Sequence, residues 1–183
     1  MRRSMTALVG MLMAMSHIDA SAQSSSPKNA TDVTRAELDT LITQFPGPGD
    51  QQLRVADAGR MNIGIAIVRW TPGARGGLMH VQVTEVYYML EGTGTLVTGG
   101  VMPGGTSLPA EGEIVKLLVG PSVSGATIQD GQSRKIGPGD VVVIPAGVPH
   151  QWATIDADMK YLVVRVDPEK VLPSGYVHPA LKN

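Results

Sequence analysis

The stretch that decides the fold runs from Gly139 to His150 and reads GDVVVIPAGVPH. Its apolar run, Val141–Ile144, has the length and β-branched composition of a buried strand. Pro145 and Gly147 follow that run and supply bends before His150. The pattern predicts one strand, a sharp turn, and a second strand that begins at a histidine.

A second stretch, Gly76–Gly92, reads GGLMHVQVTEVYYMLEG and contains His80. Side chains alternate across a strand, so His80 and Gln82 share one face. The spacing from Gln82 to Glu85 is odd, which puts them on opposite faces of an unbroken strand. A turn or bulge at Val83-Thr84 is therefore required if these side chains are to meet. The same alternation groups two further sets: Glu85, Tyr87 and Met89, and His150, Trp152 and Thr154.

The chain after Gly49 has the pattern of an all-β sandwich or barrel. Short runs rich in Val, Ile, Thr and Tyr alternate with clusters of Gly, Pro, Asp and Asn. The Gly- and Pro-rich stretch Gly99–Gly112 is expected to be a long loop, placed over the barrel mouth. The predicted strands are Leu53–Ala56, Met61–Thr71, Leu78–Gln82, Glu85–Leu90, Gly94–Thr98, Glu113–Val119, Ala126–Ile128, Ser133–Ile136, Asp140–Pro145, His150–Thr154 and Lys160–Val166.

The first 22 residues have the pattern of a secretory signal peptide. A basic start at Arg2 and Arg3 precedes a mostly apolar run, and small residues at Ala20-Ser21-Ala22 predict cleavage after Ala22. The apolar run is shorter than the roughly 20 residues that cross a bilayer, so we expect no stable membrane anchor. Export to the periplasm or the medium is the expected localisation.

Residues 23–49 are expected to form a leader and one short helix. The Ser-rich segment Gln23–Ala30 is too polar to bury. Thr34 and Glu37 have the spacing of a capping box, and apolar residues follow at helical spacing until the Pro-Gly-Pro-Gly run at 46–49.

Taken together, the two histidine stretches resemble the two conserved motifs of the cupin superfamily. The second motif reads Gly, five residues, Pro, one residue, Gly, two residues, His, and residues 139–150 match each of these positions. The first motif reads His, one residue, His, a few residues, Glu, six residues, Gly. His80, Gln82, Glu85 and Gly92 take those places, with Gln82 where a second histidine usually stands. Thr154 also replaces an Asn that often follows the last histidine.

The resemblance implies an all-β fold, a cupin jelly-roll barrel over residues 50–170, with a tail at 171–183. It also implies one divalent metal ion, which could be iron, manganese, nickel, copper or zinc, bound by His80, Gln82, Glu85 and His150. One carboxylate and three neutral ligands would leave a divalent ion with a net charge of about +1 and therefore Lewis acidic. Open coordination positions could then accept water, dioxygen or substrate oxygens.

Several other residues are candidates for the same site. Glu85 and Tyr87 are the expected catalytic residues, since either could move a proton. Arg69, Met89, Trp152 and Thr154 are expected in the pocket; Met89 and Trp152 are also ordinary core residues, and Arg69 could instead reach solvent past the rim. His178, in a polar tail, is expected on the surface.

Composition excludes some functions and leaves others open. The chain has no cysteine, so disulfides and thiolate metal sites are excluded. A formal net charge of −1 without a basic block gives no footprint for nucleic acid. A small-molecule substrate and, from the resemblance, a homodimer are the expected partners. We expect a metal-dependent, oxygenase-like enzyme; a metal-dependent lyase or isomerase and a non-enzymatic metal- or ligand-binding module remain alternatives.

Overall fold

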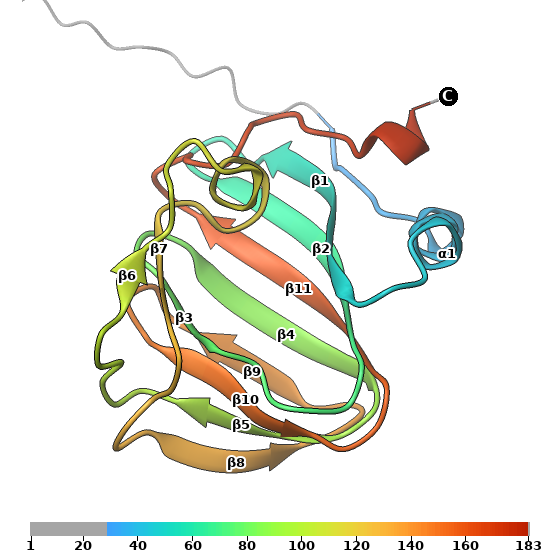
Figure 1. Cartoon of the computed structure of the whole chain (residues 1–183). Helices are drawn as coiled ribbons and strands as arrows, with labels where there is room; N and C mark the ends of the chain where they lie inside the picture. The colour runs from blue at the N-terminus through green and yellow to red at the C-terminus, as the bar shows by residue number, and fades with distance from the viewer. Residues whose placement is uncertain (1–28, 183) are drawn as a thin grey trace, which may run out of the picture.

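The computed structural model describes residues 29–182 of the chain. Two antiparallel sheets face each other, as Figure 1 shows. The predicted all-β class is confirmed. The predicted signal peptide, its predicted cleavage site and the first part of the predicted leader lie outside the described residues. Within the described part of the chain, no helix has the length and apolarity needed to cross a membrane.

The first sheet has the strand order β1-β2-β11-β4-β9. The second has the order β6-β7-β3-β10-β5-β8. Their bounds are β1 Gly49–Asp57, β2 Asn62–Trp70, β3 Gly77–His80, β4 Thr84–Glu91, β5 Gly94–Thr98, β6 Thr106–Ser107, β7 Ser122–Gly125, β8 Gln132–Ile136, β9 Val141–Ile144, β10 His150–Ile155 and β11 Met159–Asp167.

The main core lies between the two sheets, because both contribute buried apolar side chains to one cluster. It includes Val68, Met89 and Val163 from the first sheet and Leu96 and Trp152 from the second. Every second residue of β11 is buried, as expected for a strand that alternates between two faces.

The chain turns from β4 to β5 at Gly92, the last glycine of the first motif. Its φ of 78° lies in the left-handed region that favours glycine. A Cβ atom there would also lie 2.5 Å from the backbone oxygen of Asp158. The tight connection therefore needs glycine on both counts.

A second, smaller core lies on the outer face of the first sheet. Helix α1, Arg35–Gln44, has the predicted capping box between Thr34 and Glu37. It packs through Leu41 against Leu53 and Ile67. The short 3-10 helix η2, Pro179–Leu181, joins the same cluster. Figure 1 shows both helices on the outside of this sheet.

The end of the chain is more ordered than the predicted polar tail. The backbone N–H of His178 donates to Leu53 at 2.8 Å, and the Asn62 amide donates to the buried Leu172 carbonyl at 2.9 Å. His178 is itself buried and packs edge-on against Phe45. The prediction that His178 lies on the surface is therefore wrong, because contacts with β1 and with the end of α1 cover it.

Two predicted strands are also wrong. The segment Glu113–Val119 contains a π-helix, η1, at Ile114–Val119, and not a strand. Val115 and Val119 are its buried residues, and a spacing of four suits one face of a helical turn. The strand predicted at Ala126–Ile128 lies earlier, at Ser122–Gly125, where it pairs with β3.

Arg69 has a structural role that its position in an apolar strand did not reveal. Its guanidinium donates to the carbonyls of Ile42 at 3.0 Å and Phe45 at 3.4 Å, at the end of α1. The last helical turn has no basic residue of its own, so Arg69 supplies donors to carbonyls that the helix leaves unpaired.

We therefore expect Arg69→Gln to destabilise the fold by about 1 kcal/mol, the usual net contribution of a hydrogen bond. Urea unfolding followed by circular dichroism would measure the change. An unchanged unfolding midpoint would show that these contacts contribute nothing to the attachment of α1.

Candidate metal centre

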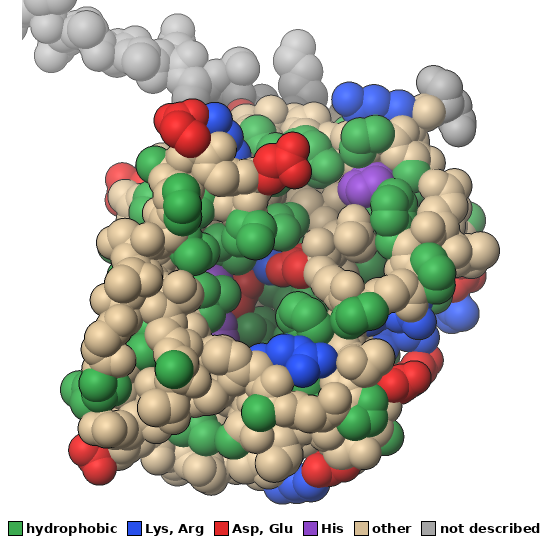
Figure 2. Space-filling view, viewed as in Figure 1, with side chains coloured by type: hydrophobic (Ala, Val, Ile, Leu, Met, Phe, Trp, Pro, Cys, Tyr) green, Lys and Arg blue, Asp and Glu red, His purple; other side chains and the backbone are tan. Residues whose placement is uncertain are grey.

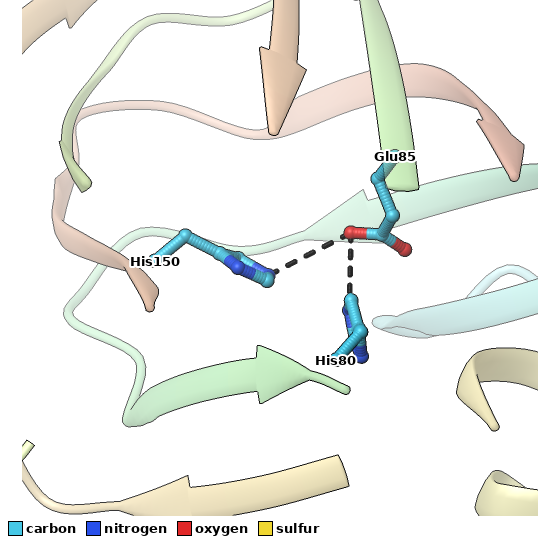
Figure 3. A group of neighbouring side chains, drawn as sticks. All are labelled: His80, Glu85 and His150. Carbon is cyan, nitrogen blue, oxygen red and sulfur yellow. Dashed lines mark ion pairs between the residues drawn. The ribbon is translucent and has the colours of Figure 1, made fainter. Parts of the chain in front are cut away.

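Three predicted ligands meet at one end of the core. His80 ends β3, Glu85 lies at the start of β4, and His150 begins β10. One ligand atom from each lies within 4.8 Å of the others, and all three residues are buried. Figure 3 shows both imidazole rings turned towards the Glu85 carboxylate. The histidines come from one sheet and the carboxylate from the other, so the site joins the two sheets.

The chain does break between His80 and Glu85, but the bend lies at Val81 and Gln82 and not at the predicted Val83-Thr84. Strand β3 ends at His80, the chain bends at Val81 and Gln82, and β4 starts at Thr84. The turn after β9 is held against this bend, since the Gly147 N–H donates to the His80 carbonyl at 2.7 Å. These local bends bring both histidine segments to the same end of the fold.

Each imidazole has one nitrogen engaged on the side away from Glu85. Nδ1 of His80 lies 2.9 Å from the Ser122 hydroxyl, whose own hydrogen is directed to the Gly120 carbonyl at 2.9 Å. Nδ1 of His150 lies 3.3 Å from the Val148 carbonyl. In both rings this arrangement places the proton of the neutral imidazole on Nδ1 and leaves Nε2 with a free lone pair.

The two oxygens of Glu85 have different surroundings. Oε2 lies 3.2 Å from Nε2 of His80 and 3.6 Å from Nε2 of His150, and it accepts a hydrogen bond of 2.8 Å from the Tyr87 hydroxyl. Oε1 accepts a 2.9 Å bond from Nε of Arg165. Only Oε2 therefore faces the two histidines.

Electrostatics keep this group of residues in a metal-binding form. Burial alone would raise the pKa of Glu85, but the charge of His80 in its protonated form and the charge of Arg165 outweigh it, and the pKa is well below its usual range. Burial lowers the pKa of His150 to about 4. Burial and the nearby Glu85 charge raise the pKa of Tyr87, so its hydroxyl keeps its proton. At neutral pH the site therefore offers an ionised carboxylate and a neutral His150 imidazole.

These residues fit a cation. When both rings are neutral and carry their proton on Nδ1, two nitrogen lone pairs face an anionic oxygen and no hydrogen lies between them. Nε2 of His80 is buried and has no hydrogen-bond partner among the described residues. A buried polar atom without a partner lowers the stability of a fold unless a ligand binds to it. Two imidazoles and one carboxylate form a donor set that suits iron, manganese, nickel, copper or zinc.

A cavity of about 70 Å³ adjoins two of these ligands, His80 and Glu85. Its polar lining includes Asp50, Tyr161 and Arg165, beside His80 and Glu85. Figure 2 shows a hollow between the sheets with histidine, acidic and basic side chains in its depth. The Tyr161 hydroxyl accepts bonds from the indole N–H groups of two tryptophans, which fixes the aromatic wall. The cavity has room for a few water-sized groups.

Among the other predicted site residues, Tyr87 lines this cavity. Met89 and Trp152 are buried in the main core, so they are the ordinary core residues that the sequence analysis gave as the alternative. Gln82 lies on the bend after β3 and is half-buried, so strand alternation does not determine its direction. Its role as a ligand stays a prediction.

Arg69 and Thr154 do not lie at the site. Arg69 is bound to the end of α1, as described above. Thr154 is exposed because the pairing of β10 with β5 shifts between Trp152 and Thr154. Such an irregularity inverts the alternation of faces, so the prediction that Thr154 shares a face with His150 is wrong. The predicted loop at Gly99–Gly112 contributes no residue to the cavity lining, whereas Val119 of η1 does.

Sequence reasoning missed Arg165, which is 1% exposed and bonded to Glu85. Strand alternation could have revealed it, because Arg165 lies on the same face of β11 as Tyr161 and Val163, which point into the core. A charged residue at an inward position of an apolar strand requires a buried partner.

Comparison with known proteins places this architecture in a family. The family model described as Cupin matches residues 57–178, which is more than half of the chain. No curated protein sequence matches this chain. A solved structure from Bacillus halodurans aligns at 14% identity and a TM-score of 0.47, covering 84% of this chain and 92% of the other.

Two further solved structures carry the name oxalate decarboxylase. One, a predicted oxalate decarboxylase from Thermotoga maritima, is 17% identical at a TM-score of 0.36, over 64% of this chain and 92% of the other. A mutant of the Bacillus subtilis enzyme is 19% identical at a TM-score of 0.44, over 67% of this chain and 26% of the other. The chain thus spans about a quarter of the Bacillus subtilis enzyme. The match of the family model over most of the folded chain shows that this protein belongs to the cupin family.

Proposed function

We propose that this cupin binds one divalent metal ion through His80, Glu85 and His150 and acts on a small organic substrate. The observation that carries the proposal is the convergence of two imidazole Nε2 atoms on one carboxylate oxygen in a buried site, with Nε2 of His80 lacking a hydrogen-bond partner within the described part of the chain. A cation is the simplest group that satisfies all three atoms at once. Gln82 is proposed as a fourth ligand from the neighbouring bend.

The bound ion would act as a Lewis acid with positions open to substrate oxygens. The chain's own residues would hold and shield it. Ser122 and the Val148 carbonyl orient the two imidazoles, and the Tyr87 hydroxyl orients Oε2 of Glu85. Such surrounding hydrogen bonds fix ligand geometry and contribute to metal affinity.

The reaction we propose first is oxygenase-like, because the ligands are poorly placed for proton transfer. Glu85 and Tyr87, the predicted catalytic residues, hydrogen bond to each other at 2.8 Å. The second Glu85 oxygen is held by Arg165, whose guanidinium also binds Asp50. Each of these groups is engaged with a protein partner, which weighs against a lyase or isomerase that uses Glu85 as a free base.

Metal content is the first expected outcome. The protein purified without chelator should contain about one equivalent of iron, manganese, nickel or copper, measured by elemental analysis. His150→Ala should weaken binding of added Co²⁺ by more than about 100-fold, because even changes outside the ligand set cost about 10- to 100-fold. Isothermal titration would measure this affinity.

His178→Ala provides the matched control, since His178 is a buried histidine outside the site. It should bind Co²⁺ with the affinity of the unaltered protein. Gln82→Ala in the same titration tests the fourth ligand. Equal affinity in the His150→Ala and unaltered proteins would remove the basis for this metal site.

Oxygen dependence separates the candidate reactions. We expect the metal-loaded protein to consume dioxygen when small organic acids, enols and phenols are supplied, as measured with an oxygen electrode. Conversion of the same compounds under argon, without oxygen uptake, would instead support a lyase or isomerase. Metal binding without turnover under either condition would support a binding module.

We also propose that two copies of the chain pair through β4 and β9. Tyr88, Val141 and Val143 are 47%, 61% and 59% exposed on the outer face of these strands. Tyr88 lies opposite Val141 in the register, so the apolar stripe is continuous. In the described structure β9 is an edge of its sheet, and a two-fold axis beside it would cover the same stripe on both copies.

Light scattering after gel filtration tests this pairing. The unaltered protein should have twice the mass of one chain, and the double variant Val141→Lys, Val143→Lys should have the mass of one chain, since buried lysines would repel each other across the axis. A monomeric unaltered protein would rule out the pairing.

A further inference from the structure

The Glu85 carboxylate is held from behind by a buried polar cluster. We call this cluster the brace; it consists of Asp50 and Gln52 on β1 and Arg165 on β11. Nη1 of Arg165 donates to Gln52 Oε1 at 2.8 Å, and Nη2 forms an ion pair with Asp50. Its Nε donates to Glu85 Oε1 at 2.9 Å. The brace therefore connects the edge strand of the first sheet to the metal centre.

The sequence leaves space for the brace. Gly64 lies on β2, opposite Arg165 in the pairing of β2 with β11. A Cβ atom at Gly64 would lie 2.7 Å from the Gln52 amide nitrogen and 3.2 Å from Cβ of Arg165. No side chain at this position could coexist with the present arrangement unless Gln52 moved.

The charges of the brace are balanced. Burial lowers the pKa of Arg165, but Asp50 and Glu85 raise it by more, so the guanidinium is charged. A buried cation that lacked a partner beside a metal would repel it. The Asp50 carboxylate offsets this charge, so Arg165 can bind Glu85 without adding net charge to the site.

The geometry of Glu85 limits how it can bind a metal. Oε1 is engaged by Arg165, whereas Oε2 alone faces the histidines. From these contacts we infer that Arg165 is a positioning residue that restricts Glu85 to binding the metal through Oε2 only. This inference rests on the proposed metal site. Its consequence is that one more coordination position stays available for a substrate oxygen than if both carboxylate oxygens bound.

The test compares Co²⁺ bound to the unaltered protein and to the charge-balanced double variant Asp50→Asn, Arg165→Gln. Removing both charges avoids leaving Asp50 buried without a partner. In the variant Oε1 is free to bind, so the visible absorption bands of saturating Co²⁺ should weaken and shift as its coordination number rises. Half-saturation should also need about 10-fold more Co²⁺, because a hydrogen bond that orients a ligand is lost.

Arg69→Gln is the matched control, since it removes an arginine from the same sheet whose contacts lie at α1. It should lower stability and leave the Co²⁺ bands unchanged. If Arg165 had only a structural role, the double variant would behave like this control: its stability would fall and its Co²⁺ bands would not change. That outcome would overturn the inference. Failure of the unaltered protein to bind Co²⁺ would instead overturn the proposed metal site itself.

Gly64→Ala keeps the test decisive if the double variant does not fold. The added methyl displaces the Gln52 amide and presses on Arg165 without removing a charge. We expect a smaller change of the Co²⁺ bands in the same direction. Bands identical to those of the unaltered protein, in a variant that unfolds at a lower urea concentration, would contradict a positioning role for the brace.

Discussion

The ion pair between Arg165 and Glu85 is the constraint on which the rest of the site depends. Both side chains are almost fully buried, and they lie directly opposite each other on neighbouring strands. An unpaired charge in that position would cost several kcal/mol, so each residue stabilises the other. The pair fixes the direction of the carboxylate, and that direction places Oε2 in front of the two histidines.

The site also couples the two sheets. The carboxylate and its brace belong to the first sheet, while His80 and His150 belong to the second. Apolar packing holds the sheets together elsewhere, but it is not directional. Hydrogen bonds to Ser122 and to the Val148 carbonyl orient the imidazoles. A bound cation would add directional contacts between the sheets, so metal binding and stability are expected to be linked.

Strand alternation predicted the site well where the strands are regular and failed where they are not. It placed Tyr87 on the same face as Glu85, and it required a break before Glu85, which the structure has at Val81 and Gln82, two residues earlier than predicted. It failed for Thr154, because an irregular pairing within β10 inverts the faces after Trp152. The prediction for Arg69 failed for another reason. The direction of its side chain depends on contacts with α1, a helix far away in the sequence. Such tertiary contacts leave no periodic signal in the strand itself.

The sequence by itself determined the fold class, the capped helix and the identity of His80, Glu85 and His150, because motif spacing and alternation are local properties of the chain. Only the tertiary structure decided that Arg165, Asp50 and Gln52 lie behind Glu85. These residues come from strands more than a hundred positions apart. Their contacts depend on strand order and on the space left at Gly64, and neither is encoded in any short stretch of sequence.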